Sequence, residues 1–125
     1  MGGVGRIGWI QVDCADPVLL ATFWADVLGT EIDGPPLGDP PHYVGLVPPS
    51  PGHPIVNFQR VPEPRATKNR LHLDVVVDDV EEATARVVGL GGSRFPSEDY
   101  SEYGFHWRVM ADLEGNEFCL IYRLP

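Results

Sequence analysis

Hydrophobic and polar positions alternate along two stretches of the chain, residues 7–13 and residues 71–77, and each stretch leads into a helical pattern. Because successive side chains of a strand point to opposite faces, we predict two strands that each have a core face and a polar face. The predicted core positions are Gly8, Ile10, Val12, Leu71, Leu73, Val75 and Val77. The positions predicted to face a wet cavity are Ile7, Trp9, Gln11, Asp13, His72, Asp74 and Val76.

The first helix is predicted to follow Asp16 and Pro17, since aspartate is a favoured N-cap and proline is favoured at the first helical position. Gly29 is expected to end it. Its apolar residues recur at helical spacing. They are Leu20, Phe23, Trp24, Val27 and Leu28.

The second helix is predicted to begin at Asp79, with Glu81 and Glu82 in its first turn, where negative charge favours the helix dipole. Gly91 is expected to end it. Its apolar face is Val80, Ala83, Val87 and Leu90.

Shorter strands complete the prediction, at residues 31–33, 43–47, 55–60 and 93–95, with a final hairpin of 106–111 and 117–123 around a turn at 112–116. Eight prolines between residues 30 and 54 limit that region to short strands and long loops. Residues 97–104 are predicted to form a loop.

The order strand, helix and three strands occurs twice, which indicates an internal repeat. A shift of 63 residues pairs Trp9 with His72 and Gln11 with Asp74, and a shift of 62 pairs the Leu-Gly steps that end the two helices. We therefore predict one domain over residues 1–125. It consists of a first module at about 6–61, a connector at 62–69 and a second module at about 70–125.

Three parts of the chain carry a family resemblance: residues 11–17 with residues 23–29, residues 69–74 (Asn-Arg-Leu-His-Leu-Asp) and residues 110–118. On these, the chain resembles the glyoxalase, bleomycin-resistance and extradiol dioxygenase (vicinal oxygen chelate) superfamily, in its glyoxalase-like branch. The resemblance implies an α+β fold of two βαβββ modules. Their eight strands would form an open, cup-shaped mixed sheet with helices outside and a ligand cavity inside, commonly as a homodimer.

Composition and charge limit the classes of partner that the protein is expected to bind. The net charge of −9 and the lack of a basic run argue against nucleic acid and anionic membranes. Two cysteines form no disulfide framework, and the sequence shows neither a signal peptide nor a long apolar run. We expect a cytoplasmic protein with a small-molecule partner.

The resemblance implies metal-ligand positions at Trp9, at Asn57 or Gln59, at His72 and at Cys119. Tryptophan cannot bind a metal, and an amide is a poor ligand for zinc or iron. We therefore predict a cup that works without a cofactor. If a divalent metal is present, we expect His72 to hold it with Glu117 or Cys119.

The cavity-facing residues suggest roles in binding or catalysis. His72 is either a general acid or base assisted by Asp74, or a structural histidine. Trp9 is predicted to stack on a flat ligand or merely to fill space. Neutral polar groups for orienting a ligand come from Gln11, Asn57 and Gln59. Trp107 belongs to an aromatic group that forms a lid or covers the core.

Two function classes follow. The first is a protein like the bleomycin-resistance proteins that binds a small, flat, partly polar organic molecule, with Glu117 and Cys119 as further wall residues. The alternative is a lyase, isomerase or epimerase that uses His72 as general acid or base. The His72→Ala variant would broadly retain binding in the first class, whereas in the alternative it would lose turnover and keep its affinity.

Overall fold

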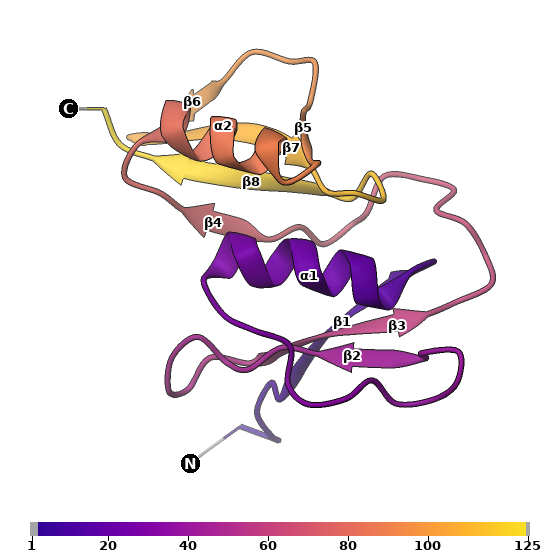
Figure 1. Cartoon of the computed structure of the whole chain (residues 1–125). Helices are drawn as coiled ribbons and strands as arrows, with labels where there is room; N and C mark the ends of the chain where they lie inside the picture. Colours follow the sequence, from indigo (N-terminus) through magenta and orange to yellow (C-terminus); the bar gives the residue numbers. More distant parts are fainter. Residues whose placement is uncertain (1–2, 125) are drawn as a thin grey trace. The chain divides into compact units, whose positions relative to one another are not determined.

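The computed structural model describes residues 3–124, which fall into two compact units that divide between Pro64 and Arg65. The division lies inside the predicted connector. Across the described residues the two units contain two helices and eight strands in open mixed sheets, which confirms the α+β prediction (Figure 1). That the whole chain is a single domain stays a prediction. Neither helix between residues 3 and 124 has the length and apolar character needed to cross a bilayer.

The first unit has a three-stranded sheet in the order β1-β3-β2, with β1 parallel and β2 antiparallel to β3. Helix α1 packs on one face of this sheet (Figure 1). The core between them is fully buried and includes Leu20, Phe23, Val56 and Phe58. The elements are β1 (Trp9–Cys14), α1 (Pro17–Leu28), β2 (Tyr43–Gly45) and β3 (Ile55–Arg60).

The second unit has a five-stranded sheet in the order β4-β8-β7-β5, with β6 paired to β7. Strand β4 runs parallel to β8 and the other pairs are antiparallel. Helix α2 packs against β5 and β8, above a core that includes Val87, Met110, Phe118 and Leu120. The elements are β4 (Asp74–Val76), α2 (Val80–Gly89), β5 (Ser93–Arg94), β6 (Tyr100–Glu102), β7 (Phe105–Ala111) and β8 (Glu117–Tyr122).

Local capping explains why both predicted helices are correct. The Asp16 carboxylate accepts a hydrogen bond from the Leu19 amide, and Gly29 ends α1 in the left-handed region at φ 68°. The Asp79 carboxylate accepts from the amides of Glu81 and Glu82. These bonds satisfy amides that have no partner inside the helix, so the start of each helix is determined by residues adjacent in sequence.

Several predicted strands are shorter than expected, with 43–47 reduced to β2 and 93–95 to β5, and the largest differences are at 71–77 and 31–33. The stretch 71–77 pairs only as β4, and Leu71, predicted to face the core, is 75% exposed. The reason is Asn69, whose carboxamide lies between the Leu71 carbonyl and the Glu117 amide and replaces the next backbone hydrogen bond between this segment and β8. Residues 31–33 form a single bridge, Ile32 to Leu46, in the proline-rich region.

One strand was missed. Residues Tyr100–Glu102 were predicted as loop but form β6 in a hairpin with β7. Its two-residue turn, Tyr103-Gly104, has positive φ at both positions (51° and 82°), as a type I′ turn requires. Glycine supplies one of these angles readily, but tyrosine is rare in this conformation, so residues 103 and 104 did not indicate a hairpin turn.

Candidate functional site

One face of the second unit's sheet carries most of its chemically distinctive side chains. Residues paired across neighbouring strands project to the same face. Asp74 lies opposite Cys119, and Cys119 lies opposite Val109. Two residues further along each strand, the same face presents a second row: Val76, Ile121, Trp107 and Tyr100.

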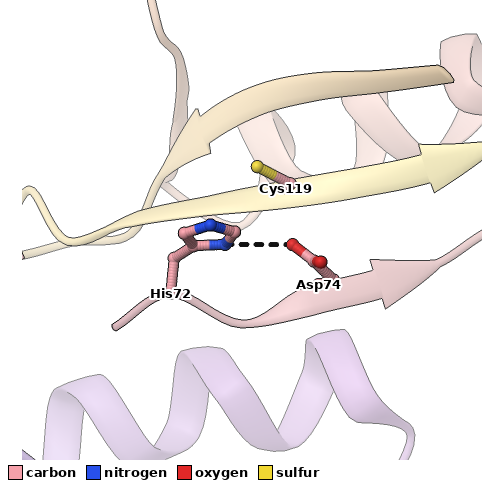
Figure 2. A group of neighbouring side chains, drawn as sticks. All are labelled: His72, Asp74 and Cys119. Carbon is pink, nitrogen blue, oxygen red and sulfur yellow. Dashed lines mark ion pairs between the residues drawn. The ribbon is translucent and has the colours of Figure 1, made fainter. Parts of the chain in front are cut away.

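At one end of this face His72 and Asp74 form a pair. The His72 Nδ1 lies 3.0 Å from Asp74 Oδ1, and both side chains are about half exposed. Figure 2 shows the two groups pointing toward each other, with Cys119 beside them on β8. Because Nδ1 faces the carboxylate, Nε2 is the ring nitrogen available to a ligand. The pair that the sequence suggested is therefore present.

Cys119 lies beside the His72–Asp74 pair as an uncharged side chain. Its side chain is buried. Burial raises the pKa of the Cys119 thiol, and the negative charge of Asp74 raises it further. A protonated thiol is a poor nucleophile, so the electrostatics favour the interpretation of Cys119 as a wall residue.

The second row is apolar and partly open to solvent. The rings of Tyr100 and Trp107 stack with centroids 5.6 Å apart and planes 14° apart. Tyr100 is 47% exposed and Val76 is 81% exposed. The sequence left open whether Trp107 forms a lid or covers the core. The structure places it on this face, in a strand pair with β6 that was not predicted.

Glu117 does not join the His72 cluster. Its carboxylate is 3.0 Å from Arg65 and 3.6 Å from Lys68, and only 11% of the side chain is exposed. The pairing of these basic residues of the connector with Glu117 was not predicted from the sequence. The Glu117 carboxylate is thus engaged in ion pairs within the second unit.

The first unit presents the other predicted residues on one face of its own sheet. Gln11 lies opposite Asn57, and the Asn57 amide donates to Gln11 Oε1 at 2.9 Å. Gln59 projects to the same face from β3, and Trp9 does so from β1 with 62% of its surface exposed. Asp13, which lies opposite Gln59, projects there as well, so this face offers amides, an indole and a carboxylate.

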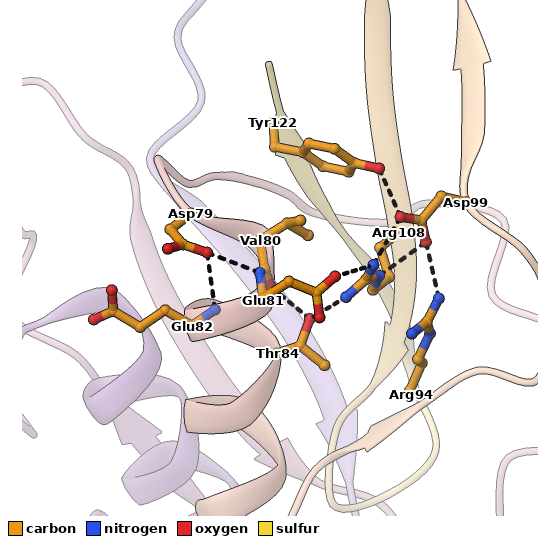
Figure 3. Close-up of polar contacts among 9 residues, drawn as sticks. All are labelled: Asp79, Val80, Glu81, Glu82, Thr84, Arg94, Asp99, Arg108 and Tyr122. Atoms are coloured by element: carbon orange, nitrogen blue, oxygen red, sulfur yellow. Dashed lines mark hydrogen bonds and ion pairs between the residues drawn. The ribbon is translucent and has the colours of Figure 1, made fainter. Parts of the chain in front are cut away.

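Sequence reasoning missed the most connected polar group, Arg108. Its guanidinium is buried, donates to both carboxylate oxygens of Asp99 at 2.8 Å, and also reaches Glu81 and Thr84 on α2 (Figure 3). The hydrogen bond from Arg108 is the main cause that lowers the pKa of Asp99, and Tyr122 donates a further one at 2.6 Å. This network lies on the α2 side of the sheet and joins α2, β7 and β8. Its role is structural.

With this geometry established, comparison with known proteins identifies the family. The family model described as "Glyoxalase-like domain" matches residues 9–121. The chain belongs to this family. A search of curated proteins finds no match.

Solved structures agree with the glyoxalase-like fold. A glyoxalase/bleomycin resistance protein/dioxygenase family enzyme from Burkholderia phytofirmans is 18% identical with a TM-score of 0.68, and the match covers 96% of this chain and 100% of that one. A glyoxalase family protein from Bacillus cereus is 15% identical with a TM-score of 0.71, covering 99% and 97%. A superfamily member from Sphaerobacter thermophilus is 17% identical with a TM-score of 0.69, covering 96% and 98%. At these identities the likeness extends to the fold alone.

The glyoxalase-like domain brings together one donor set suited to a metal among residues 3–124. The ligand atoms of His72, Asp74 and Cys119 all lie within 4.8 Å of one another. Imidazole, carboxylate and thiolate are ligands that zinc accepts, and bound zinc would supply a Lewis acid for a ligand oxygen. Binding would require the thiolate form of Cys119, which the raised pKa of its thiol opposes.

Proposed function

We propose that the glyoxalase-like domain binds a small, flat, partly polar organic molecule, and that this binding needs no metal. One observation carries the proposal. A polar pair, His72 and Asp74, and an aromatic stack, Tyr100 and Trp107, occupy the same face of one sheet. Small-molecule sites combine apolar surface with a few placed polar groups in this way.

The spacing of these groups supports a flat ligand of modest size. Asp74 and Trp107 are two strands and one residue pair apart. At about 4.8 Å per strand and about 6.7 Å per residue pair, their backbones are separated by roughly 12 Å. In the proposed complex an aromatic portion packs on Trp107 and Ile121, while polar groups reach His72 Nε2 and the Asp74 carboxylate.

The amide face of the first unit is a second proposed contact surface. Trp9, Gln11, Asn57 and Gln59 remain predicted ligand-binding residues, and exposed Trp9 offers a stacking surface. We propose that their contribution to affinity is smaller, because these four side chains are neutral and the amides of Gln11 and Asn57 already bond to each other.

A fragment screen tests the proposal. The probes are flat bicyclic aromatics that carry an amide, hydroxyl or amine group, and binding is followed by saturation-transfer NMR before and after chelator treatment. We expect hits that survive chelation and weaken in His72→Ala. The matched control is His106→Ala, because His106 lies on β7 next to Trp107 but on the opposite face, against Tyr122. Hits that disappear with the metal, or that are unaffected by His72→Ala, would contradict the proposal.

The second candidate function is a lyase, isomerase or epimerase. The observation that favours it is the 3.0 Å contact between His72 and Asp74, since a carboxylate that holds Nδ1 orients the other ring nitrogen for proton transfer. Solvent deuterium exchange into bound fragments separates the two functions. Exchange that His72→Ala abolishes, with affinity retained, would establish catalysis.

Assembly and location remain proposals. We propose a homodimer, because β4 lies at an edge of its sheet and exposes Val76. Sedimentation velocity would measure the mass in solution, and a monomer at micromolar concentration would contradict the dimer. Cys14 and Cys119 are buried and form no disulfide within residues 3–124, which is compatible with the proposed cytoplasmic location.

A further inference from the structure

The ladder between β4 and β8 is interrupted at a defined point. The Cys119 amide donates to the Leu73 carbonyl at 2.9 Å, and the Val77 amide donates to the Ile121 carbonyl at 2.9 Å. Continuing this parallel register by two residues would pair the Glu117 amide with the Leu71 carbonyl. That direct bond is replaced by a side chain.

The replacement is the carboxamide of Asn69. The Glu117 amide donates to Asn69 Oδ1 at 3.1 Å, and Asn69 Nδ2 donates to the Leu71 carbonyl at 2.5 Å. A longer contact of 3.4 Å joins Nδ2 to the Glu117 carbonyl. An amide carries one acceptor and two donors, so this single side chain satisfies both backbone partners of the missing rung.

The Glu117 side chain holds the same segment at a second point. Its nearly buried carboxylate pairs with Arg65 and Lys68, which precede Asn69. The start of β8 is therefore bonded to residues 65–69 through both its backbone and its side chain. The chain that leads to His72 is fixed to the sheet without being part of it.

This insertion affects the position of His72. In a regular strand, residues 72 and 74 would project side by side from backbone positions about 6.7 Å apart. An intervening carboxamide separates the 69–72 backbone from β8, so His72 lies outside the strand (Figure 2). In this position its ring approaches the Asp74 carboxylate to 3.0 Å.

We propose that Asn69 is the positioning residue of the site. Its carboxamide, inserted between Leu71 and Glu117, holds His72 in contact with Asp74. The inference rests on the proposed function only in assuming that the His72–Asp74 pair binds a ligand. The geometry it describes can be tested without a ligand.

The test compares the ring ¹⁵N chemical shifts of His72 in folded variants, because these shifts report the proton and hydrogen-bond state of Nδ1. Asp74→Ala, which removes every acceptor at that position, defines the signature of a broken pair. We expect Asn69→Ala to lose the wild-type signature and to match Asp74→Ala. Asn69→Asp removes the donor to the Leu71 carbonyl and keeps an acceptor for Glu117, so it is expected to lose the signature as well.

The matched control is Asn116→Ala. The Asn116 amide donates to Asp112 at 3.0 Å in the β7–β8 turn, so its loss removes a comparable side-chain bond from the same unit. The control should lower the melting temperature and leave the His72 signature unchanged. An unchanged signature in either folded Asn69 variant would overturn the proposal. Failure of both variants to fold would assign Asn69 a purely structural role and also overturn it.

The two proposals fail separately. Absence of fragment binding to the wild-type protein, with the His72 signature dependent on Asn69, would reject the proposed function and leave the positioning role intact. Fragment binding that persists while the signature ignores Asn69 would reject the positioning role alone.

Discussion

The two units start with equivalent strands that are paired differently. In the first unit β1 matches β3 over six residues, from Trp9 to Cys14. In the second, β4 matches β8 over three residues, and Asn69 occupies the next rung. In both, the first strand is parallel to the last strand of its own unit. The two units thus share this strand pairing, but in the second unit residues 69–72 are not paired directly with the sheet.

The side chains at equivalent positions of the two units also differ in chemistry. Gln11 of the first unit bonds to the Asn57 amide, whereas its equivalent, Asp74, faces an imidazole and a thiol. A pair of amides can only accept and donate hydrogen bonds, but a carboxylate beside histidine can also hold a charge or move a proton. The comparison teaches that one architecture places a neutral amide pair at these positions in one unit and titratable groups at the equivalent positions in the other.

The largest expected effect is on the free energy of unfolding, and it compares two arginines, Arg108 in the second unit and Arg60 in the first, that each link several elements of their own unit. Arg108 is buried among carboxylates, while Arg60 donates to the backbone carbonyls of Pro41 and Ala15 at 2.8 Å. Arg108→Met should lower the free energy of unfolding by about 3 kcal/mol, because it leaves Asp99 without its principal partner. Arg60→Met should cost about 1 to 2 kcal/mol. Urea denaturation measures both, and equal losses would contradict the contrast.

The same contrast extends to pH. Because Arg108 lowers the pKa of folded Asp99 below 3.8, the contribution of this carboxylate is present above pH 3.8 and is lost as pH falls through the lower folded value. Wild-type stability should therefore fall more steeply below pH 3.8 than that of Arg108→Met. Arg60→Met should retain the wild-type slope. Parallel slopes for all three proteins in acid denaturation would show that Asp99 is not coupled to Arg108.

A smaller effect is expected at the ends of the helices. Gly29 follows α1 at φ 68° with open space around it, whereas Gly91 follows α2 at φ 105°, where an added Cβ would lie 2.8 Å from Leu113 Cδ2. Alanine at position 29 should cost about 1 kcal/mol, and alanine at position 91 about 2 to 3 kcal/mol. Thermal melts of the two variants measure the difference, and a Gly91 variant as stable as the Gly29 variant would contradict it.

The smallest effect concerns the two indoles. Trp107 shares a face with Asp74 and His72, whereas Trp9 lies on the sheet that carries the amides. Trp107→Ala should weaken fragment binding by about tenfold, corresponding to an aromatic contact of roughly 1.4 kcal/mol. Trp9→Ala should weaken it by about twofold. Titration by NMR gives both constants, and an equal loss would show that the ligand depends on both faces.

The parts that were predictable depend on residues close in sequence. Helices α1 and α2 were predictable from their N-caps, Asp16 and Asp79, and β3 was predictable from its alternating apolar and polar residues. The spacing of two residues between His72 and Asp74 suggested that they pair. The insertion of Asn69 was not predictable, because its partner on β8 is 48 residues away.

Long-range pairing also explains what was missed elsewhere. Arg108 meets Glu81 across 27 residues, and nothing near either residue in the sequence indicates that they touch. Glu117 was considered as a wall residue or ligand because it shares a strand face with Cys119. Its engagement by Arg65, 52 residues earlier, depends on how the connector lies along β8.

The most direct test of the proposed binding face is a map of backbone amide shifts in ¹H–¹⁵N spectra during titration with the fragment hits. We predict that the largest shifts cluster at His72, Asp74, Trp107 and Cys119, with smaller changes near Gln11 and Asn57. Shifts confined to the first unit, or centred on the α2 side of the second sheet around Arg108, would contradict the assignment of ligand binding to the His72 face.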